Sequence, residues 1–495
     1  LIMVGGDRVD EYAHLIANHF AQAGEDADEA EWQARAGKRA AARYAVTDAL
    51  RALDRALELL PATETSRRFD LLLDREKLYN IQAARDLQAR DLGELERIVD
   101  GFDDLAARAE VALRWASYHL AMGDFQAAIA SATQAAELAT GAGDVTQQAR
   151  AAILHGNSLR FLGDFAGTRA RLSDGLRLAQ AAQAKSVEMD ALRSLGIAAQ
   201  EQGDLSEQLL YFEGALALAR EIGDLWGARR ALNSLGIIEQ NKGSYESAQT
   251  YFEQSLAIAR DIGDRLGENT VLGNLGVQAT GLGQFPEARA YLEEALQIAR
   301  DTDDVVGVNT WLLNLAYIVA VLGDVDRALG LYDEVRVNVV AAGDRPLLGY
   351  VENGVGRVLL ESGRPTEAIP RLQQALALRE SLEQPHLAAE SRLLLAEALA
   401  TTDDVSEAMA TVEEGLAFLQ VESLETTEDT ARGLLAAYRV LSAAGDDRAG
   451  AILERAYDEV QAMVAPFDES SRRAYLENVP CHREIVALRE AMRSD

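Results

Sequence analysis

Cysteine and proline are scarce in this sequence. Of its 495 residues, one is cysteine (Cys481) and eight are proline. A single cysteine excludes an intrachain disulfide framework and a cysteine-rich zinc site, and it favours a reducing, cytoplasmic setting. Because 48% of the residues are apolar, the chain should fold rather than stay disordered. No run approaches the roughly 18 apolar residues of a membrane span.

Basic residues are also fewer than acidic residues. The chain carries 48 basic and 80 acidic side chains, a net charge of −32. Such a chain repels nucleic acid and anionic membranes at long range. We therefore expect neither as a direct partner.

Motifs for catalysis, metals and nucleotides are missing. The sequence has no HExxH and no GxxxxGK[ST] phosphate-binding loop. His14 and His19 lie five residues apart, which does not place both on one helical face. Among 80 acidic residues a pair of carboxylates is no specific sign of acid–base chemistry. We expect no enzyme, no cofactor and no metal site; a hydrolase without a recognisable motif is the alternative from another class.

A glycine returns at a constant interval of forty residues. The positions are Gly123, Gly163, Gly203, Gly243, Gly283, Gly323 and Gly363, and Asp403 takes the next place in this register. A second set of turns follows twenty residues later, as in Gly143-Asp144 and Gly223-Asp224. Glycine ends a helix in the left-handed conformation, and the following Asp can cap the next helix. The period therefore predicts repeated helix–turn–helix units.

Small residues recur at fixed distances from the turn glycines. Gly196, Gly236 and Gly276 precede them by seven residues, and alanines follow by five residues at 128, 248, 288, 328 and 368. These positions predict close approach between the two helices of a unit. One unit cannot bury its apolar face alone, so stacking of neighbouring units must supply the core. The expected fold class is all-α.

The repeated residues resemble the tetratricopeptide signature. They are seen best in Asn274-Leu275-Gly276, Gly283, Phe285, Ala288, Leu292 and Ala295. The resemblance implies a tetratricopeptide-repeat (TPR) α-solenoid, a right-handed superhelix of antiparallel helix pairs, with a period of forty instead of thirty-four residues. We expect an irregular helical, TPR-like segment over 1–100, about eight units over 101–445, and a helical cap over 446–495.

The N-terminal segment adds a second resemblance. Residues 11–25, together with Trp32, Ala36-Gly37 and Asp91-Leu92-Gly93, are similar to the helical segment after the nucleotide-binding module of bacterial STAND-type signalling ATPases and transcriptional regulators. This implies a cytoplasmic sensor arm that restrains an ATPase until a ligand binds. The first residue is Leu1 and not Met, so we expect a piece of a longer protein. The alternative is a free-standing TPR adaptor that bridges two proteins.

The family pattern also implies where a partner binds. In TPR proteins the first helix of each pair lines the concave groove, and its groove positions lie 13, 10, 9, 6, 3 and 2 residues before the turn glycine. In the early and central repeats these positions hold Arg150, Asn157, Arg160, Arg193, Gln200, Arg230, Asn233, Gln240, Asn241 and Asn274, with Asp190 and Glu201 as acidic exceptions.

Arginine offers a planar fork for carboxylate or phosphate, and Asn and Gln can bind a peptide backbone. We expect a protein or peptide partner with an acidic segment, or a small phosphate-bearing ligand. The alternative is that these arginines only pair with Glu and Asp on adjacent helices. In later repeats the same positions hold Leu313, Ala320 and Val321, which could receive an amphipathic helix.

Overall fold

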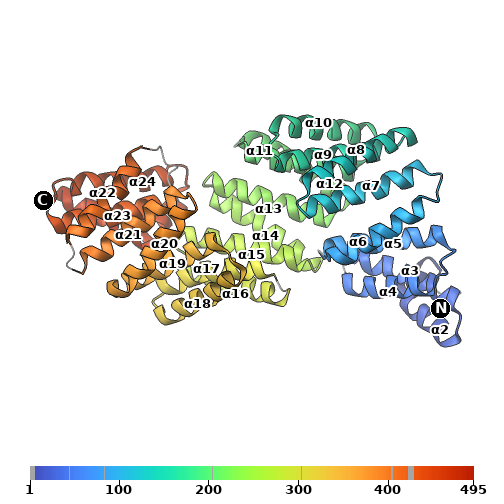
Figure 1. Ribbon diagram of the computed structural model, residues 1–495, viewed down its shortest axis with the longest axis horizontal. Helices are drawn as coiled ribbons and strands as arrows, with labels where there is room; N and C mark the ends of the chain where they lie inside the picture. The colour runs from blue at the N-terminus through green and yellow to red at the C-terminus, as the bar shows by residue number, and fades with distance from the viewer. Residues whose placement is uncertain are drawn as a thin grey trace. The chain divides into compact units, whose positions relative to one another are not determined.

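The computed structural model is helical throughout the residues that it describes, which are 6–43, 45–82, 84–202, 204–302, 304–402, 405–421 and 428–494. These ranges contain one 3-10 helix, 25 α-helices and no strand (Figure 1). The chain divides into two compact units. Unit 1 comprises Leu1–Leu235 and Ala257–Asp264, and unit 2 comprises Gly236–Leu256 and Arg265–Asp495.

Most helices have between fourteen and eighteen residues and follow one another after short turns. In chain order they are η1 (Gly6–Tyr12), α2 (Ala13–Ala23), α3 (Asp26–Ala42), α4 (Val46–Leu59), α5 (Thr65–Ile81), α6 (Arg85–Val99), α7 (Leu105–Ala121), α8 (Phe125–Ala142), α9 (Val145–Phe161), α10 (Phe165–Ala181), α11 (Lys185–Glu201), α12 (Leu205–Ile222), α13 (Leu225–Asn241), α14 (Tyr245–Asp261), α15 (Arg265–Gly281), α16 (Phe285–Asp301), α17 (Val305–Val321), α18 (Val325–Ala342), α19 (Arg345–Glu361), α20 (Pro365–Ser381), α21 (Pro385–Ala400), α22 (Val405–Val421), α23 (Glu428–Ala444), α24 (Ala449–Val464), α25 (Glu469–Asn478) and α26 (Pro480–Ser494).

The turns have the predicted conformation. Gly163 and Gly363 adopt φ values of 77° and 75°, the left-handed region that glycine enters without a Cβ clash. The Asp after the glycine caps the next helix: the Gly167 amide donates to Asp164 Oδ1 over 2.9 Å. The predicted turn positions Gly203 and Asp403 lie outside the described residues.

Small residues bring the paired helices together, as predicted. A Cβ atom built on Gly196 would lie 2.8 Å from the Phe212 ring, and one on Gly236 would lie 2.5 Å from the Phe252 ring. The five alanines at 128, 248, 288, 328 and 368 have no exposed surface. A large ring or Leu on the second helix therefore fills the space that glycine leaves on the first, and the all-α TPR solenoid is confirmed.

None of the described helices is long and apolar enough to cross a membrane.

Candidate ligand-binding site

Four charged residues form a ladder on successive first helices of unit 1. Glu110 (α7), Arg150 (α9), Asp190 (α11) and Arg230 (α13) are each forty residues apart and alternate in sign. Arg150 Nη2 lies 3.2 Å from Glu110 Oε1. Arg150 and Arg230 both stabilise the charge on Asp190. The period thus places one charge per forty-residue repeat in register. Arg150 forms an ion pair with Glu110, and Arg150 and Arg230 attract Asp190 through space.

Arg193, one turn after Asp190 on α11, adds a positive charge that the ladder does not balance. Its side chain is 23% exposed, and its Nε lies 4.0 Å from Asp190 Oδ1, too far for a hydrogen bond. Within the described part of the chain, that Nε has no hydrogen-bond partner. Burial, followed by repulsion from Arg230, lowers the pKa of Arg193 to about 10, although Asp190 opposes this. An anion bound here would offset both the burial of the Arg193 charge and its repulsion from Arg230.

Two of the predicted arginines are instead held by carboxylates. Arg150 pairs with Glu110, and Arg160 pairs with Glu201 and stacks 4.1 Å above the Phe161 ring centre. Burial alone would raise the pKa of Glu110, but its bonds to Arg150 and Arg114 outweigh this and lower it to about 2. For Arg150 and Arg160 the structure therefore favours the alternative interpretation, pairing between adjacent helices.

The remaining predicted residues are spread over both units. Asn157 donates to Ser194 Oγ over 3.2 Å and so ties α9 to α11. Gln200 is exposed and Asn233 half-buried, both in unit 1. Gln240, Asn241 and Asn274 belong to unit 2, so only the first seven of the ten predicted residues lie in the same unit as Arg193 and Arg230, which we call the arginine cluster.

Sequence reasoning missed Glu110, the partner that neutralises Arg150. It stands forty residues before Arg150, so the register itself was the signal. Applying the groove pattern one repeat earlier would have found it.

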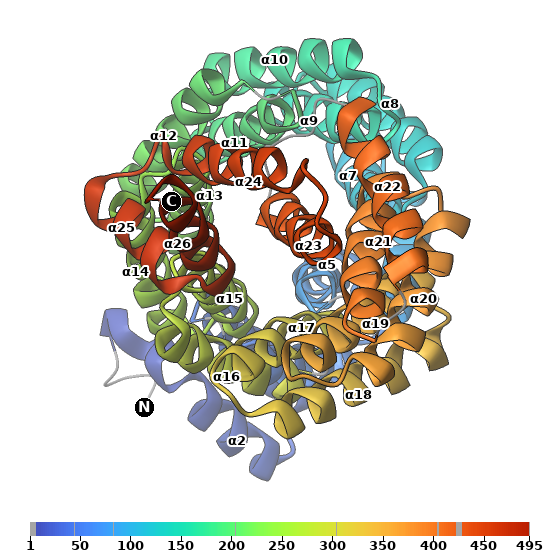
Figure 2. The same ribbon diagram turned by 90° about the vertical axis from the view of Figure 1, so that its left-hand side faces the viewer.

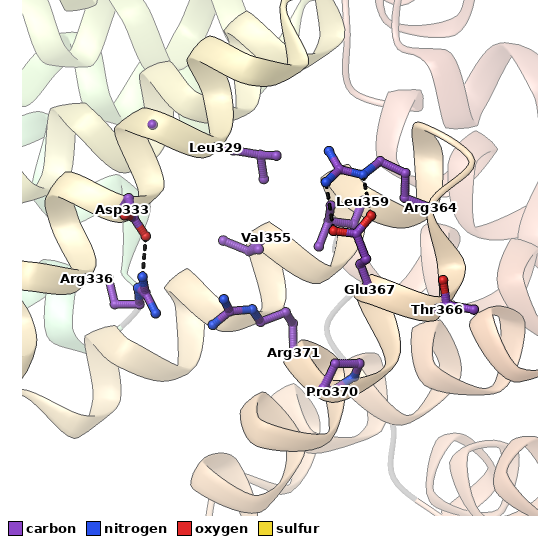
Figure 3. Close-up of a pocket in the computed structure, with 11 residues that line it drawn as sticks. Leu329, Asp333, Arg336, Val355, Leu359, Arg364, Thr366, Glu367, Pro370 and Arg371 are labelled. Atoms are coloured by element: carbon purple, nitrogen blue, oxygen red, sulfur yellow. Dashed lines mark hydrogen bonds and ion pairs between the residues drawn. The ribbon is translucent and has the colours of Figure 1, made fainter.

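Unit 2 contains a cleft that the predicted groove positions do not include (Figure 3). It measures about 590 Å³ and is lined by α18, α19 and α20, with Leu329 and Val355 among its apolar residues. Its three arginines each have a carboxylate partner. Arg336 pairs with Asp333, Arg364 donates to Glu367 over 2.7 and 2.8 Å, and Arg371 lies 3.0 Å from Glu352. The charges cancel, so this cleft has no preference for an anion.

Among the described residues, no group of three or more His, Cys, Asp or Glu side chains is placed to hold a metal ion. The candidate site in unit 1 is the arginine cluster of Arg193 and Arg230, whose two positive charges repel each other.

The repeated helix pairs place the protein in the class of helical-repeat proteins. Within that class, a tetratricopeptide-repeat family model matches residues 227–301 and 307–381, and a second tetratricopeptide-repeat model matches residues 359–423. The matched part of the chain consists of tetratricopeptide repeats, and the fold resembles that of a STAND signalling ATPase with a tetratricopeptide-repeat sensor. A comparison with curated proteins finds no match.

Solved structures with a similar fold include two regulators. The apo form of the quorum sensor NprR from B. thuringiensis has a TM-score of 0.53 at 14% identity, covering 72% of this chain and 99% of that one. A STAND protein with a tetratricopeptide-repeat sensor from Pyrococcus horikoshii has a TM-score of 0.52 at 14% identity, covering 84% of this chain and 65% of that one. At this identity the likeness concerns the fold.

Proposed function

We propose that this protein is a non-catalytic binding scaffold, and that its unit 1 holds an acidic group of a protein or peptide partner between Arg193 and Arg230. The observation that carries the proposal is Arg193, a largely buried guanidinium whose Nε has no hydrogen-bond partner among the described residues and lies 4.0 Å from the Asp190 carboxylate. A bidentate carboxylate or phosphate would supply the missing acceptor. In a chain of net charge −32, a surplus of positive charge at one point also gives selectivity.

The test is a titration of the purified protein with a labelled hexaglutamate peptide and with inorganic phosphate. The double variant Arg193→Glu/Arg230→Glu should weaken peptide binding by about tenfold or more, because charge-assisted hydrogen bonds are lost and repulsion is gained. Binding by the wild type should also weaken as salt increases.

The matched control is Arg300→Glu/Arg327→Glu, which changes the net charge equally. Both control arginines pair with half-exposed carboxylates, Glu334 and Glu293. Equal loss in the two double variants would mean that only the overall charge matters and would refute the site. Phosphate that competes with the peptide would point to a phosphate-bearing ligand.

Asp190 provides an opposite test. Its side chain is 53% exposed and its carboxylate lies 4.0 Å from Arg193 Nε, so it competes with a ligand's carboxylate for that arginine. Partial desolvation raises the pKa of Asp190, although Arg193 and Arg230 oppose this. Asp190→Asn removes this internal competitor, so the variant should bind hexaglutamate more tightly than the wild type. Weaker binding would show that Asp190 orients the arginines and that the ligand sits elsewhere.

We infer further that the scaffold is the cytoplasmic sensor arm of a bacterial signalling ATPase or transcriptional regulator. The support is the resemblance of residues 11–25 and 91–93 to the segment that follows the nucleotide-binding module in such proteins. An in-frame nucleotide-binding module encoded upstream of Leu1, with an ATPase rate that responds to the captured ligand, would support this role. A start codon directly before Leu1 would favour a free-standing adaptor.

A further inference from the structure

The C-terminal segment packs back onto two much earlier turns of unit 2. Pro466 and Phe467 contact the turn between α13 and α14 at Gly243, and Asn478 contacts the turn between α15 and α16 at Gly283. In the view of Figure 2, α25 and α26 overlap α14. The segment thus bridges elements separated by about 200 residues of sequence.

These two turns differ from the equivalent turns elsewhere. A Cβ atom on Gly243 would lie 2.7 Å from Phe467 Cδ1, and one on Gly283 would lie 2.4 Å from Asn478 Cβ. At Gly323 and Gly363, which hold the same left-handed conformation, no heavy atom lies within 4 Å of the added Cβ. Gly243 and Gly283 are also buried. The absence of a side chain at these two turns makes room for the C-terminal segment.

A column of aromatic rings continues the contact into the cap. Tyr245 meets Phe467 edge to face with ring centres 4.7 Å apart, Phe467 meets Tyr475 at 5.4 Å, and Tyr475 stacks on His482 at 4.2 Å. The His482 side chain has no exposed surface. Burial raises the pKa of Tyr245 to about 12, which agrees with its position under Phe467.

We propose that residues 466–482 form a latch, a reversible contact that closes unit 2 on itself through Gly243, Gly283 and Tyr245. While the latch is docked, the repeats from α14 to α24 are held at both ends and their curvature is set. When it undocks, the repeats between the two ends are free to change pitch. The inference does not depend on the arginine cluster, whose residues Arg193 and Arg230 belong to unit 1.

The chemistry of the contact suits repeated opening. In the described residues, the atoms of the segment nearest the two turns are a Phe467 ring carbon, Asn478 Cβ and backbone atoms of Pro466, Asn478 and Val479, and Phe467 also meets the Tyr245 ring. Contacts of this kind add little stability individually and are remade easily. Tyr475, Val479 and Cys481 belong to the core of the C-terminal helices, so undocking separates the segment from the two turns and leaves that core intact. The strength of the contacts with the turns should depend little on salt, whereas ligand binding by arginines is screened.

The test is amide hydrogen exchange on the full chain, comparing Gly243→Ala/Gly283→Ala with Gly323→Ala/Gly363→Ala. Both double variants place alanine at two left-handed backbone positions, but only the first obstructs the latch. We expect residues 466–482 to exchange about three- to tenfold faster in the first variant and at the wild-type rate in the control. Equal acceleration in the two variants, or none in either, would overturn the proposal.

Phe467→Ala provides a second test that leaves the turns intact. It should accelerate exchange at residues 243–246, far away in sequence, and X-ray scattering should show an altered radius of gyration. Phe418→Ala is its control, because Phe418 packs edge to face on His386 outside the latch. If Phe467→Ala leaves exchange at 243–246 unchanged, the contact is not a latch. If exchange changes but scattering does not, the latch does not set curvature and the proposal fails.

Discussion

At the residue scale, the repeat places equivalent charged side chains on successive first helices, where they form the ladder. Because equivalent positions stand forty residues apart, Glu110, Arg150, Asp190 and Arg230 lie on successive first helices and alternate in charge. Pairs of this kind hold neighbouring repeats in register. Arg193 is the residue that breaks the balance, and for that reason it is the better candidate for ligand recognition.

The ladder predicts acid sensitivity. The pKa of Glu110 is about 2 in the folded chain against a model-compound value of 4.5. A lowered pKa gives stability that is fully present above pH 4.5 and is lost as the pH falls towards 2. After allowance for screening at Arg150, Glu110→Gln should lower the free energy of unfolding at pH 7 by about 2 kcal/mol.

Urea unfolding at pH 7 and pH 3 measures this effect, and the difference between Glu110→Gln and the wild type should shrink at the lower pH. Glu293→Gln is the control, because Glu293 and its partner Arg327 are both half-exposed, and it should cost less than about 0.5 kcal/mol. A pH-independent loss at Glu110 would assign its effect to packing.

Among the described residues, two that are not glycine occupy left-handed turn positions. Gln183 has φ 52° and Glu383 has φ 55°, in the register where other repeats use Gly143 and Gly223. A side chain in this conformation costs about 1 kcal/mol, partly offset by the greater freedom of an unfolded glycine. Gln183→Gly should therefore stabilise the chain by about 0.5 kcal/mol, measured by urea unfolding. The reverse change, Gly223→Gln, should destabilise it, and stabilisation by both would contradict the backbone explanation.

At the element scale, the two helices of a pair pack closely where a large side chain on one faces a glycine on the other. Phe252 on α14 fills the space over Gly236 of α13, and Leu292 on α16 does so over Gly276 of α15. Glycine is not needed for packing at every helix position. A Cβ atom on Gly330 of α18 would meet no heavy atom within 4 Å.

Replacing glycine by alanine should therefore act with opposite sign at two helix positions. Gly236→Ala should destabilise by roughly 1–3 kcal/mol because Phe252 must move. Gly330→Ala should stabilise by about 0.5–1 kcal/mol because helix propensity rises without a clash. Thermal unfolding followed by circular dichroism distinguishes the two, and the same sign at both positions would refute the packing argument.

At the scale of the whole molecule, each repeat contacts chiefly its neighbours, so damage should stay local. Leu172 and Leu372 hold the same place in their repeats, facing Gly156 and Gly356, and both are fully buried. One belongs to unit 1 and the other to unit 2.

Leu172→Ala should cost about 2–5 kcal/mol locally and accelerate amide exchange in α9–α12. Leu372→Ala should do the same in α19–α22. Exchange measured on each full-length variant compares the two directly. Uniform acceleration along the whole chain in either variant would mean that the array unfolds as one cooperative body.

The repeating elements were predictable because their causes are local. Gly163 and Asp164 terminate one helix and cap the next through backbone geometry that a few neighbouring residues decide. The spacing of Gly196, Gly236 and the alanines also predicted which faces meet. The groove residues were placed only by family pattern. The same register holds Glu110 and Glu201, but it did not decide whether Arg150 and Arg160 bind these carboxylates or a ligand.

By itself the sequence determined the all-α class, the forty-residue unit, the turns and the faces that pair, because each follows from periodicity and from conformational preferences within about twenty residues. Tertiary structure decided the rest. Whether Arg193 keeps a partner, and whether Phe467 meets Gly243 and Tyr245, depends on how small rotations accumulate over several stacked repeats. No local sequence pattern predicts the total rotation over several repeats. Contacts between distant repeats are therefore known only from the folded structure.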